Sequence, residues 1–257
     1  MDKIIQRVKK AGKGYRLSTD MIKIVCFADD VISDNEDDLQ RMAYEFKLAA
    51  EEYNMIISIS ETKSLVIARE PKRCKIVINN EIIEQVSKFE YLGVEISDCG
   101  GLKAAVRKQA NKAAYVSGCL RDVIWRNKDL RLDGKVRIYK ACVRPIMTYS
   151  IETRADTAEA KRILRTTEKK ALRSIAGKTL LDRIPNSQIR ELCKVQDVVR
   201  WGRQRRRDWN QHVSRMDPQR LARIARDLKP LGKRPPGRPF NRWRDSWQST
   251  SQLLLQN

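Results

Sequence analysis

The sequence predicts an α+β protein in which antiparallel strands and one packed helix come first, and an all-helical region with a basic tail follows. Three observations carry this prediction. Short apolar, β-branched runs separated by turn residues occupy residues 21–98. Apolar residues at helical spacing dominate after Gly100-Gly101. A segment of Pro, Gly and basic residues at 229–239 can form neither a helix nor a central strand.

The positive charge of the chain is concentrated in its C-terminal part. The 257 residues carry a formal net charge of +21. Residues 1–100 hold 15 Lys and Arg against 18 Asp and Glu, residues 101–200 hold 24 against 10, and residues 201–257 hold 14 against 4. This surplus indicates a polyanionic partner, and nucleic acid is the simplest one. Hydrophobic residues make up 41% of the chain, so a core is expected.

Neither a membrane protein nor a secreted protein is expected. No stretch approaches the roughly 18 apolar residues of a spanning helix, and the N-terminus lacks the apolar core of a signal peptide. The closest pair of cysteines is 20 residues apart and His212 is the only histidine, so no structural zinc site is expected. We therefore expect a nuclear or cytoplasmic protein with reduced cysteines.

The N-terminal part predicts a hairpin, a helix and several further strands. Residues 21–27 predict a buried strand, and Asp29-Asp30 separate it from Val31-Ile32, which predicts a β-hairpin with both aspartates at its turn. Asp34-Asn35 offers an N-cap for an amphipathic helix of about five turns. The apolar face of that helix consists of Leu39, Met42, Phe46, Ala49, Ala50 and Tyr53. Further strands are predicted at 55–59, 64–68, 75–78, 81–86 and 89–96, with Asn79-Asn80 as a turn.

The C-terminal part predicts helices joined by short loops. The expected helices span about 102–124, 130–147 with Pro145 near its end, 156–175 ending near Gly177, and 187–216 with polar interruptions. Residues 229–239 predict an extended basic linker before a short segment that bears tryptophan.

Phe27-Ala28-Asp29-Asp30 is the strongest candidate for chemistry. Nucleotidyl transfer uses two Mg²⁺ ions. Mg²⁺ prefers hard oxygen ligands and is often bound by one or two carboxylates together with substrate phosphate. Two carboxylates at the tip of a hairpin suit such a site. The alternative is that Asp-Asp is ordinary polar turn chemistry.

The order of these features resembles the palm of a non-LTR retrotransposon reverse transcriptase. The matching series is strand–Phe-Ala-Asp-Asp–strand, a helix, Glu61-Thr62-Lys63 before a strand, and Phe89-Glu90-Tyr91-Leu92-Gly93. The resemblance implies an RNA-directed DNA polymerase that extends a DNA 3′ end on an RNA template. It divides the chain into a partial palm at 1–98, a thumb-like helical region at 99–180 and a basic C-terminal region at 181–257.

The resemblance also implies roles for individual residues. Asp29 and Asp30 would be ligands of Mg²⁺ or Mn²⁺, and Lys63 the general acid for the pyrophosphate leaving group. The residues that would position the primer are Phe89, Tyr91, Leu92 and Gly93. The alternatives are an ordinary surface lysine at position 63 and a core strand that ends in a turn at 89–93.

Three further blocks extend the resemblance to roughly residues 14–247. Residues 149–154 are similar to Tyr-Gly-x-Glu-Thr-Trp, with Ser150 in the Gly position and Arg154 in the Trp position. Residues 209–216 are similar to Trp-x-Gly-His-Val-x-Arg-Met, with Gln211 in the Gly position. Residues 237–245 are similar to Gly-Arg-Pro-x-x-Arg-Trp-x-Asp.

The C-terminal part also predicts a nucleic-acid-binding surface, because arginines neutralise phosphates and tryptophan faces stack on unpaired bases. The alternatives are a solvated helix face with tryptophan in the core, or a nuclear-localisation patch. An AT-hook is disfavoured because Pro236 stands before Gly237, and His212 has no nucleophile that the sequence ties to it. The candidate residues are Arg200, Arg203, Arg205, Arg206, Arg207, Trp209 and Arg238.

Three functions stay open at this point. The first is a fragment of a reverse transcriptase with an RNA template and a DNA primer as partners. The second is a catalytically dead nucleic-acid-binding remnant, either domesticated or pseudogene-derived, and the third is an unrelated basic scaffold. Only 26 residues precede Phe27, so the fingers and first catalytic strand of the family have no counterpart in this sequence. We expect the isolated chain not to extend a primer.

Overall fold

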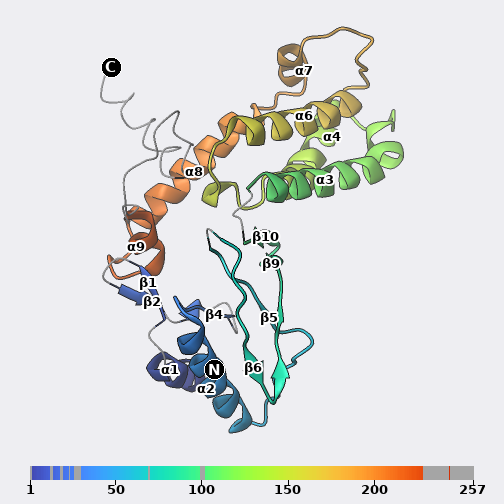
Figure 1. The fold of residues 1–257 in the computed structure, drawn as a ribbon. Coiled ribbons are helices and arrows are strands. Elements are labelled where there is room, and N and C mark those ends of the chain that lie inside the picture. The colour runs from blue at the N-terminus through green and yellow to red at the C-terminus, as the bar shows by residue number, and fades with distance from the viewer. Residues whose placement is uncertain are drawn as a thin grey trace. The chain divides into compact units, whose positions relative to one another are not determined.

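The computed structural model describes residues 2–11, 14–17, 20–22, 24–25, 30–68, 70–98, 102–227 and 243. The chain forms two compact units (Figure 1). The N-terminal unit comprises Met1–Gly100 and Pro218–Pro230, and the helical unit comprises Gly101–Asp217 and Leu231–Asn257. Helices and small sheets together give the α+β class that the sequence predicts. Among the described residues, no helix is both long enough and apolar enough to cross a bilayer.

In its described residues, the N-terminal unit combines three helices with five two-stranded sheets. Its described helices are α1 (Asp2–Ala11), α2 (Glu36–Glu51) and α9 (Leu221–Asp227). Its described strands are β1 (Tyr15–Leu17), β2 (Asp20–Ile22), β3 (Ile24–Val25), β4 (Asp30–Val31), β5 (Lys63–Ser64), β6 (Val77–Ile78), β7 (Glu81–Ile82), β8 (Glu84–Gln85), β9 (Lys88–Tyr91) and β10 (Val94–Ser97).

Helix α2 organises this unit. Asn35 caps it as predicted, because its side chain accepts a hydrogen bond from the Asp38 backbone N–H at 2.8 Å. One face of α2 packs against α1 through Ile4, Val8, Met42 and Ala49. On the other side, Gln40 makes two 2.8 Å hydrogen bonds with the backbone N–H and carbonyl of Val77, which hold β6 against the helix.

The predicted hairpin around the two aspartates is confirmed in its pairing. Strands β3 and β4 are antiparallel, with Ile24 opposite Val31 and Val25 opposite Asp30. Asp30 therefore begins the second strand, whereas the connection at 26–29 falls outside the described residues. In place of one strand over 21–27, the described residues show β2, which pairs with β1, and a separate β3.

Several strand predictions between 55 and 96 need correction. Residues 55–59 form no strand, because turns satisfy their backbone locally: Met55 N–H donates to the Ala50 carbonyl and Thr62 N–H to the Ser58 carbonyl. The strand expected at 64–68 is reduced to β5, and the one at 81–86 is divided into β7 and β8. The Asn79-Asn80 turn is confirmed: both residues have positive φ, 54° and 62°, as a two-residue hairpin turn requires.

The helical unit contains the helices predicted at 102–124, 130–147 and 156–175. Its core is built by buried apolar residues from all of these helices, among them Trp125, Tyr139, Met147 and Leu172. Helices α3 and α6 pack side by side (Figure 1). The described helices are α3 (Leu102–Leu120), η1 (Arg121–Trp125), α4 (Leu132–Ile138), η2 (Tyr139–Val143), α5 (Arg144–Met147), η3 (Ile151–Thr153), α6 (Ala158–Ile175), α7 (Asn186–Leu192) and α8 (Val198–Ser214).

Two details of the helical unit differ from a simple helix pattern. A π-helical turn, η2, directly precedes α5, whose second residue is Pro145, and such a turn accommodates a proline that cannot donate a backbone hydrogen bond. The single helix predicted at 187–216 is wrong, because α7 ends at Leu192 and α8 begins at Val198. Asp197 caps α8 by accepting hydrogen bonds from the backbone N–H groups of Val199 and Arg200.

Candidate nucleic-acid interface

One of the two candidate metal ligands, Asp30, lies on the β3–β4 hairpin. Asp30 is half-buried at the start of β4, whereas Asp29 falls outside the described residues. Among the described residues, no group of three or more His, Cys, Asp or Glu side chains could hold a metal ion. Two adjacent carboxylates nevertheless suit Mg²⁺ that shares its coordination with a substrate phosphate.

Lys63, the candidate general acid, lies on β5, which pairs in parallel with β8. Its ammonium nitrogen forms an ion pair with the Glu84 carboxylate at 2.6 Å. Glu84 is two-thirds exposed, so this ion pair is at the surface and is weak. In this structure Lys63 is therefore bound to Glu84, and a role in proton transfer requires that pair to open.

The segment predicted to position the primer forms a hairpin of its own. Strands β9 and β10 pair from Tyr91 opposite Val94 to Lys88 opposite Ser97. Leu92 and Gly93 make the turn with φ values of 47° and 74°. A leucine with positive φ is strained, and this one is also 48% exposed. A strained, exposed apolar residue at a hairpin tip is a candidate contact point for a ligand.

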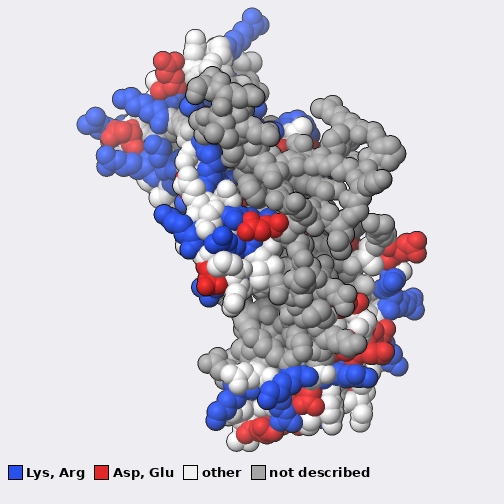
Figure 2. All heavy atoms as spheres, turned by 90° about the vertical axis from the view of Figure 1, so that its left-hand side faces the viewer, with Lys and Arg blue, Asp and Glu red and all other residues white. Residues whose placement is uncertain are grey.

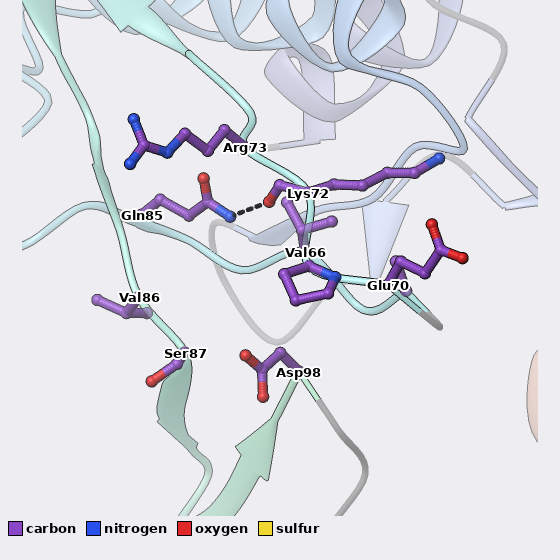
Figure 3. A pocket seen from close by; sticks show the side chains of 10 residues that line it. Val66, Glu70, Lys72, Arg73, Gln85, Val86, Ser87 and Asp98 are labelled. Atoms are coloured by element: carbon purple, nitrogen blue, oxygen red, sulfur yellow. Dashed lines mark hydrogen bonds between the residues drawn. The ribbon is translucent and has the colours of Figure 1, made fainter.

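A shallow open groove of about 530 Å³ lies beside the base of this hairpin (Figure 3). The Gln85 side chain fixes one wall, because it donates to the Lys72 carbonyl at 2.7 Å and accepts from the Cys74 N–H at 2.9 Å. The side chains of Lys72 and Arg73 point away from each other in Figure 3. Asp98 and Glu70 also line the groove, so its charge is mixed.

The three catalytic elements predicted from the sequence lie in one unit but on separate two-stranded sheets: β3–β4, β5–β8 and β9–β10. The predicted nucleic-acid-binding arginines lie instead in the helical unit, on α8. Arg238 falls outside the described residues. The described candidate residues therefore belong to two different units, each of which is considered by itself.

One arginine of α8, Arg206, has a buried side chain. Arg206 is 5% exposed. Its guanidinium donates to the Ile151 carbonyl at 3.0 Å and pairs with Asp156 at 3.5 Å. Burial lowers the pKa of Arg206, and the nearby Asp156 carboxylate opposes that shift. Because its side chain already fastens α8 to η3, we leave Arg206 out of the proposed surface.

The remaining α8 arginines are at the surface. Arg203 pairs with Asp156 at 3.1 Å and Arg205 with Glu152 at 3.2 Å, and both side chains are about half exposed. Arg200 is exposed, and Arg207 contacts Gln204. The guanidinium groups of Arg203 and Arg205 are thus accessible from solvent, although their partners Asp156 and Glu152 are mostly buried.

The tryptophans of α8 have intramolecular partners. Arg144 stacks over the Trp201 ring at 4.8 Å and Arg205 at 5.8 Å. Trp209 meets Trp243 edge to face, with ring centroids 5.5 Å apart at 70°. Trp209 is half-buried in this pair. It therefore packs against another side chain and also remains partly at the surface, so its position combines the two alternatives that the sequence left open.

The block at 149–154 contains two residues in unfavourable settings. Ser150 has φ 57°, in the left-handed region that favours glycine. Arg154 is 6% exposed, and its Nε and Nη2 atoms have no hydrogen-bond partner in the part of the chain that the structure describes. Burial lowers the pKa of Arg154. These are the two positions at which the sequence departs from the glycine and tryptophan of the reverse-transcriptase block.

A buried ionic cluster joins α6, α7 and the start of α8, and sequence analysis missed it. Glu168 is fully buried and pairs with Arg190 at 2.9 Å, and Arg190 also reaches Asp197 at 2.8 Å. Burial raises the pKa of Glu168 to about 7, although Arg190 opposes the shift. Burial alone would raise the pKa of Asp197, but hydrogen bonds from Arg165 and from the Arg200 backbone outweigh it and lower the pKa. Glu168 occupies one charged position within an apolar helix pattern, which the sequence alone does not distinguish from a surface residue.

Basic side chains are numerous on the helical unit. Residues 101–217 contain 29 Lys and Arg against 12 Asp and Glu, a surplus of 17. On the face shown in Figure 2, the described Lys and Arg of the upper part of the view outnumber the acidic side chains. Such a surplus attracts a polyanion at long range, and salt screens the attraction.

Comparison with known proteins gives one related chain. A Caenorhabditis elegans protein described as an uncharacterized transposon-derived protein is 24% identical over 234 residues, which cover 86% of this chain and 82% of that protein. None of the protein-family models matches the chain, and no solved structure matches it. The similarity supports a transposon-related origin.

Proposed function

We propose that the chain is the C-terminal portion of a non-LTR retrotransposon reverse transcriptase, and that it binds RNA and DNA. The observation that carries the proposal is the order of elements: a hairpin that contains Asp30, helix α2, the Lys63 strand, the Leu92-Gly93 hairpin and then a basic helical unit. Similarity to a transposon-derived protein over most of the chain agrees with this origin.

The block at 149–154 adds independent support. Glycine is the residue that adopts φ 57° without strain, and a large apolar ring fits the buried position of Arg154 better than an unpartnered guanidinium. The backbone at these two positions therefore suits the glycine and tryptophan of the family block. This agreement supports the proposal.

In the proposed enzyme, Asp29 and Asp30 hold Mg²⁺ or Mn²⁺, and the metal supplies charge neutralisation at the transferred phosphate. Lys63 leaves Glu84 and donates a proton to the leaving group. The β9–β10 hairpin contacts the primer through its exposed tip at Leu92. The arginines of α8 hold the nucleic-acid backbone.

A second candidate function is nucleic-acid binding without catalysis. The observation that favours it is the surplus of 17 positive charges in residues 101–217, which needs no metal site to act. In addition, Asp29 and Asp30 are adjacent, and alternation along a strand points neighbouring side chains in different directions. A two-metal site needs carboxylates in more than one position around the ions.

Binding is tested by fluorescence anisotropy with labelled single-stranded RNA, single-stranded DNA and an RNA–DNA hybrid. We expect the affinity to fall by orders of magnitude between about 50 and 200 mM salt if six or more phosphates are neutralised. An affinity that is flat across the salt titration would contradict both candidate functions.

Catalysis is tested with primed RNA, deoxynucleotides and Mg²⁺ or Mn²⁺, beside the Asp29→Ala, Asp30→Ala double variant. We expect the 257-residue chain to bind the primed template and to leave the primer at its original length. Extension by the parent chain that the double variant loses would assign a working polymerase site to Asp29 and Asp30. Equal extension by both proteins would indicate a contaminating polymerase.

A further inference from the structure

The α6–α7 loop, residues 177–185, presents two adjacent leucines to solvent (Figure 1). Leu180 is 80% exposed and Leu181 is 91% exposed, so they are the most exposed large apolar side chains among the described residues of the helical unit. Ile184, the remaining aliphatic residue of the loop, packs against the core instead. The loop therefore buries one aliphatic side chain and leaves two in water.

The start of the α6–α7 loop is fixed by hydrogen bonds at the end of α6. Gly177 adopts φ 62°. The Lys178 N–H donates to the Arg173 carbonyl at 2.9 Å, and the Gly177 N–H donates to the Ser174 carbonyl at 3.3 Å. These are the two bonds of a Schellman motif. The direction in which the chain leaves α6 is therefore set by the backbone.

Side chains fasten the loop on both sides of the leucines. Arg173 donates to the Thr179 carbonyl at 2.9 Å and to the Ile184 carbonyl at 2.6 Å. The Asp182 carboxylate accepts from the Thr179 backbone N–H at 2.5 Å and from its hydroxyl at 2.9 Å. Because these bonds hold the backbone before and after the leucines, the exposure of the pair is a property of the folded loop.

Positive charge flanks the leucine pair. Lys178 lies two residues before it and the exposed Arg183 two residues after it. Residues 169–194 hold 7 Lys and Arg against 2 Asp and Glu, a surplus of 5. Cα atoms two residues apart are separated by at most about 7.6 Å, which is close to the roughly 6 Å width of the minor groove of DNA. A leucine placed in that groove would therefore bring the flanking cations to the phosphates that border it.

A second copy of the chain and a lipid bilayer are the competing occupants of this leucine pair. A second copy would place the positive charge of the loop region opposite itself, and like charges repel. A bilayer would gain less from two leucines than from a single myristoyl chain, which by itself gives only marginal membrane binding. A DNA duplex matches both properties of the loop, because its phosphates neutralise the cations and apolar side chains can insert between its base steps.

We propose that Leu180 and Leu181 form an apolar wedge that inserts between base steps of double-stranded DNA, while Lys178 and Arg183 hold the adjacent phosphates. This inference rests on the proposed nucleic-acid binding. It adds double-stranded DNA as a ligand of the helical unit and predicts that the bound duplex is bent, because a wedge that unstacks a base step kinks the double helix.

The first experiment measures bending of a DNA duplex of about 20 base pairs that carries a donor dye at one end and an acceptor dye at the other. A kink brings the ends together and raises energy transfer. We expect the full-length parent to cause this rise at saturating protein, and the Leu180→Ser, Leu181→Ser double variant to lose most of it. The Leu180→Phe, Leu181→Phe double variant should keep it, because large apolar side chains remain in the loop. Circular dichroism verifies that the helices persist.

The matched control is the Met55→Ser, Ile56→Ser double variant. Met55 and Ile56 are also adjacent and exposed, at 39% and 92%, but they belong to the N-terminal unit. We expect this control to bend the duplex as the parent does. Equal bending by the parent and the leucine-to-serine variant would overturn the wedge. An equal loss in the control and the leucine-to-serine variant would also overturn it, because any exposed apolar pair would then serve.

The second experiment measures binding of the same duplex across a salt titration. Loss of two phosphate contacts lowers the slope of log affinity against log salt by about 1.8, which changes the affinity ratio between 50 and 200 mM salt by about 12-fold. We expect this loss in the Lys178→Gln, Arg183→Gln double variant. The leucine-to-serine variant should keep the parent slope, because leucine releases no counterions. A parent slope in the glutamine variant would overturn the assigned phosphate contacts.

The remaining outcomes separate the wedge from the function on which it rests. A parent protein that binds neither RNA nor DNA would overturn both. A parent that binds DNA with strong salt dependence but does not bend it would overturn the wedge alone. Light scattering and co-sedimentation with phosphatidylcholine–phosphatidylserine vesicles test the other occupants. A parent dimer, or vesicle binding, that the leucine-to-serine variant loses while bending is unchanged would assign the leucines to a second copy or to a membrane.

Discussion

Ser150, Arg154 and Gln211 are the three positions where the chain departs from the family blocks, and the structure separates them into two kinds. Ser150 adopts φ 57°, and Arg154 is buried with no partner among the described residues for two of its nitrogen atoms. Gln211 lies instead on an exposed position of helix α8, where glutamine is a better helix former than glycine. Only the first two departures conflict with their surroundings.

Replacing the two conflicting residues with the family residues is expected to stabilise the helical unit. Ser150→Gly should gain about 1 kcal/mol by removing strain, less the contribution of the Ser150–Thr153 hydroxyl contact at 2.6 Å. Arg154→Trp should gain about 1–3 kcal/mol by removing a buried unsatisfied group. Gln211→Gly is the control and should cost about 1 kcal/mol. Urea unfolding measures all three, and a destabilising Arg154→Trp would contradict the assignment of that position.

Glu168 is expected to give the helical unit an unusual pH dependence. Its folded pKa is about 7, above the ordinary 4.5, because burial disfavours the carboxylate. The unfolded chain therefore loses this proton first, so the contribution of Glu168 to stability is complete below about pH 4.5 and falls as pH rises to about 7. Asp197, whose pKa is lowered, titrates below this window and has the opposite sign. Glu168→Gln should remove the falling segment from a plot of unfolding free energy against pH. An unchanged plot would refute the raised pKa of Glu168 in the folded protein.

At the level of elements, local patterns in the sequence were sufficient where local chemistry decides the structure. The Asn35 cap, the Asn79-Asn80 turn and the end of α6 near Gly177, which has φ 62°, each depend on residues within one turn of chain. The strand predicted at 55–59 failed because only Ile57 and Ile59 pack against the Ile76, Ile78 and Ile83 cluster, from a segment without repetitive structure, whereas Ile56 is exposed. Apolar alternation shows which residues are buried but does not show whether a partner strand is available.

The candidate site could be predicted only in part for the same reason. The sequence identified Trp209, Glu152 and Trp243 as members of separate blocks, but their meeting depends on how α8 packs against η3. The burial of Arg206 was also invisible, because five arginines in residues 200–207 look equivalent in sequence. Long-range packing distinguishes the one arginine that faces the interior.

We expect Gly202 to determine how closely α8 packs against η3. In Gly202→Ala the new Cβ overlaps the Ile151 Cδ1 atom, which should cost about 1–3 kcal/mol. Ile151→Val removes Cδ1 and alone should cost about 1 kcal/mol. The double variant should be more stable than the sum of the two changes allows. Gly118→Ala in α3 is the control, because a Cβ there meets nothing within 4 Å and alanine favours a helix. Strict additivity would refute the close contact.

For the whole molecule, the distribution of charge predicts different contributions of the two units to nucleic-acid binding. Residues 1–100 carry a net charge of −3, whereas residues 101–217 carry +17. Long-range attraction of a polyanion should therefore come mainly from the helical unit, and the N-terminal unit should contribute short-range contacts through its hairpins. The two contributions differ in salt dependence, because only neutralised phosphates release counterions.

Two matched sets of six substitutions to glutamine in the full-length chain test this division, each confined to exposed Lys and Arg side chains. The helical-unit set is Arg107, Arg121, Arg137, Lys170, Arg200 and Arg215. The N-terminal set is Lys10, Arg41, Lys72, Arg73, Lys75 and Lys88. Both sets change the net charge by the same amount, so a difference between them reports the position of the charges.

We expect the helical-unit set to weaken binding of single-stranded RNA at 100 mM salt at least about 10-fold and to flatten the salt dependence, as the loss of several phosphate contacts requires. The N-terminal set should weaken binding by less than about 3-fold, because residues 1–100 hold 18 Asp and Glu against 15 Lys and Arg. Equal losses from both sets would mean that total charge alone governs binding, and a larger loss from the N-terminal set would move the polyanion site to the hairpins.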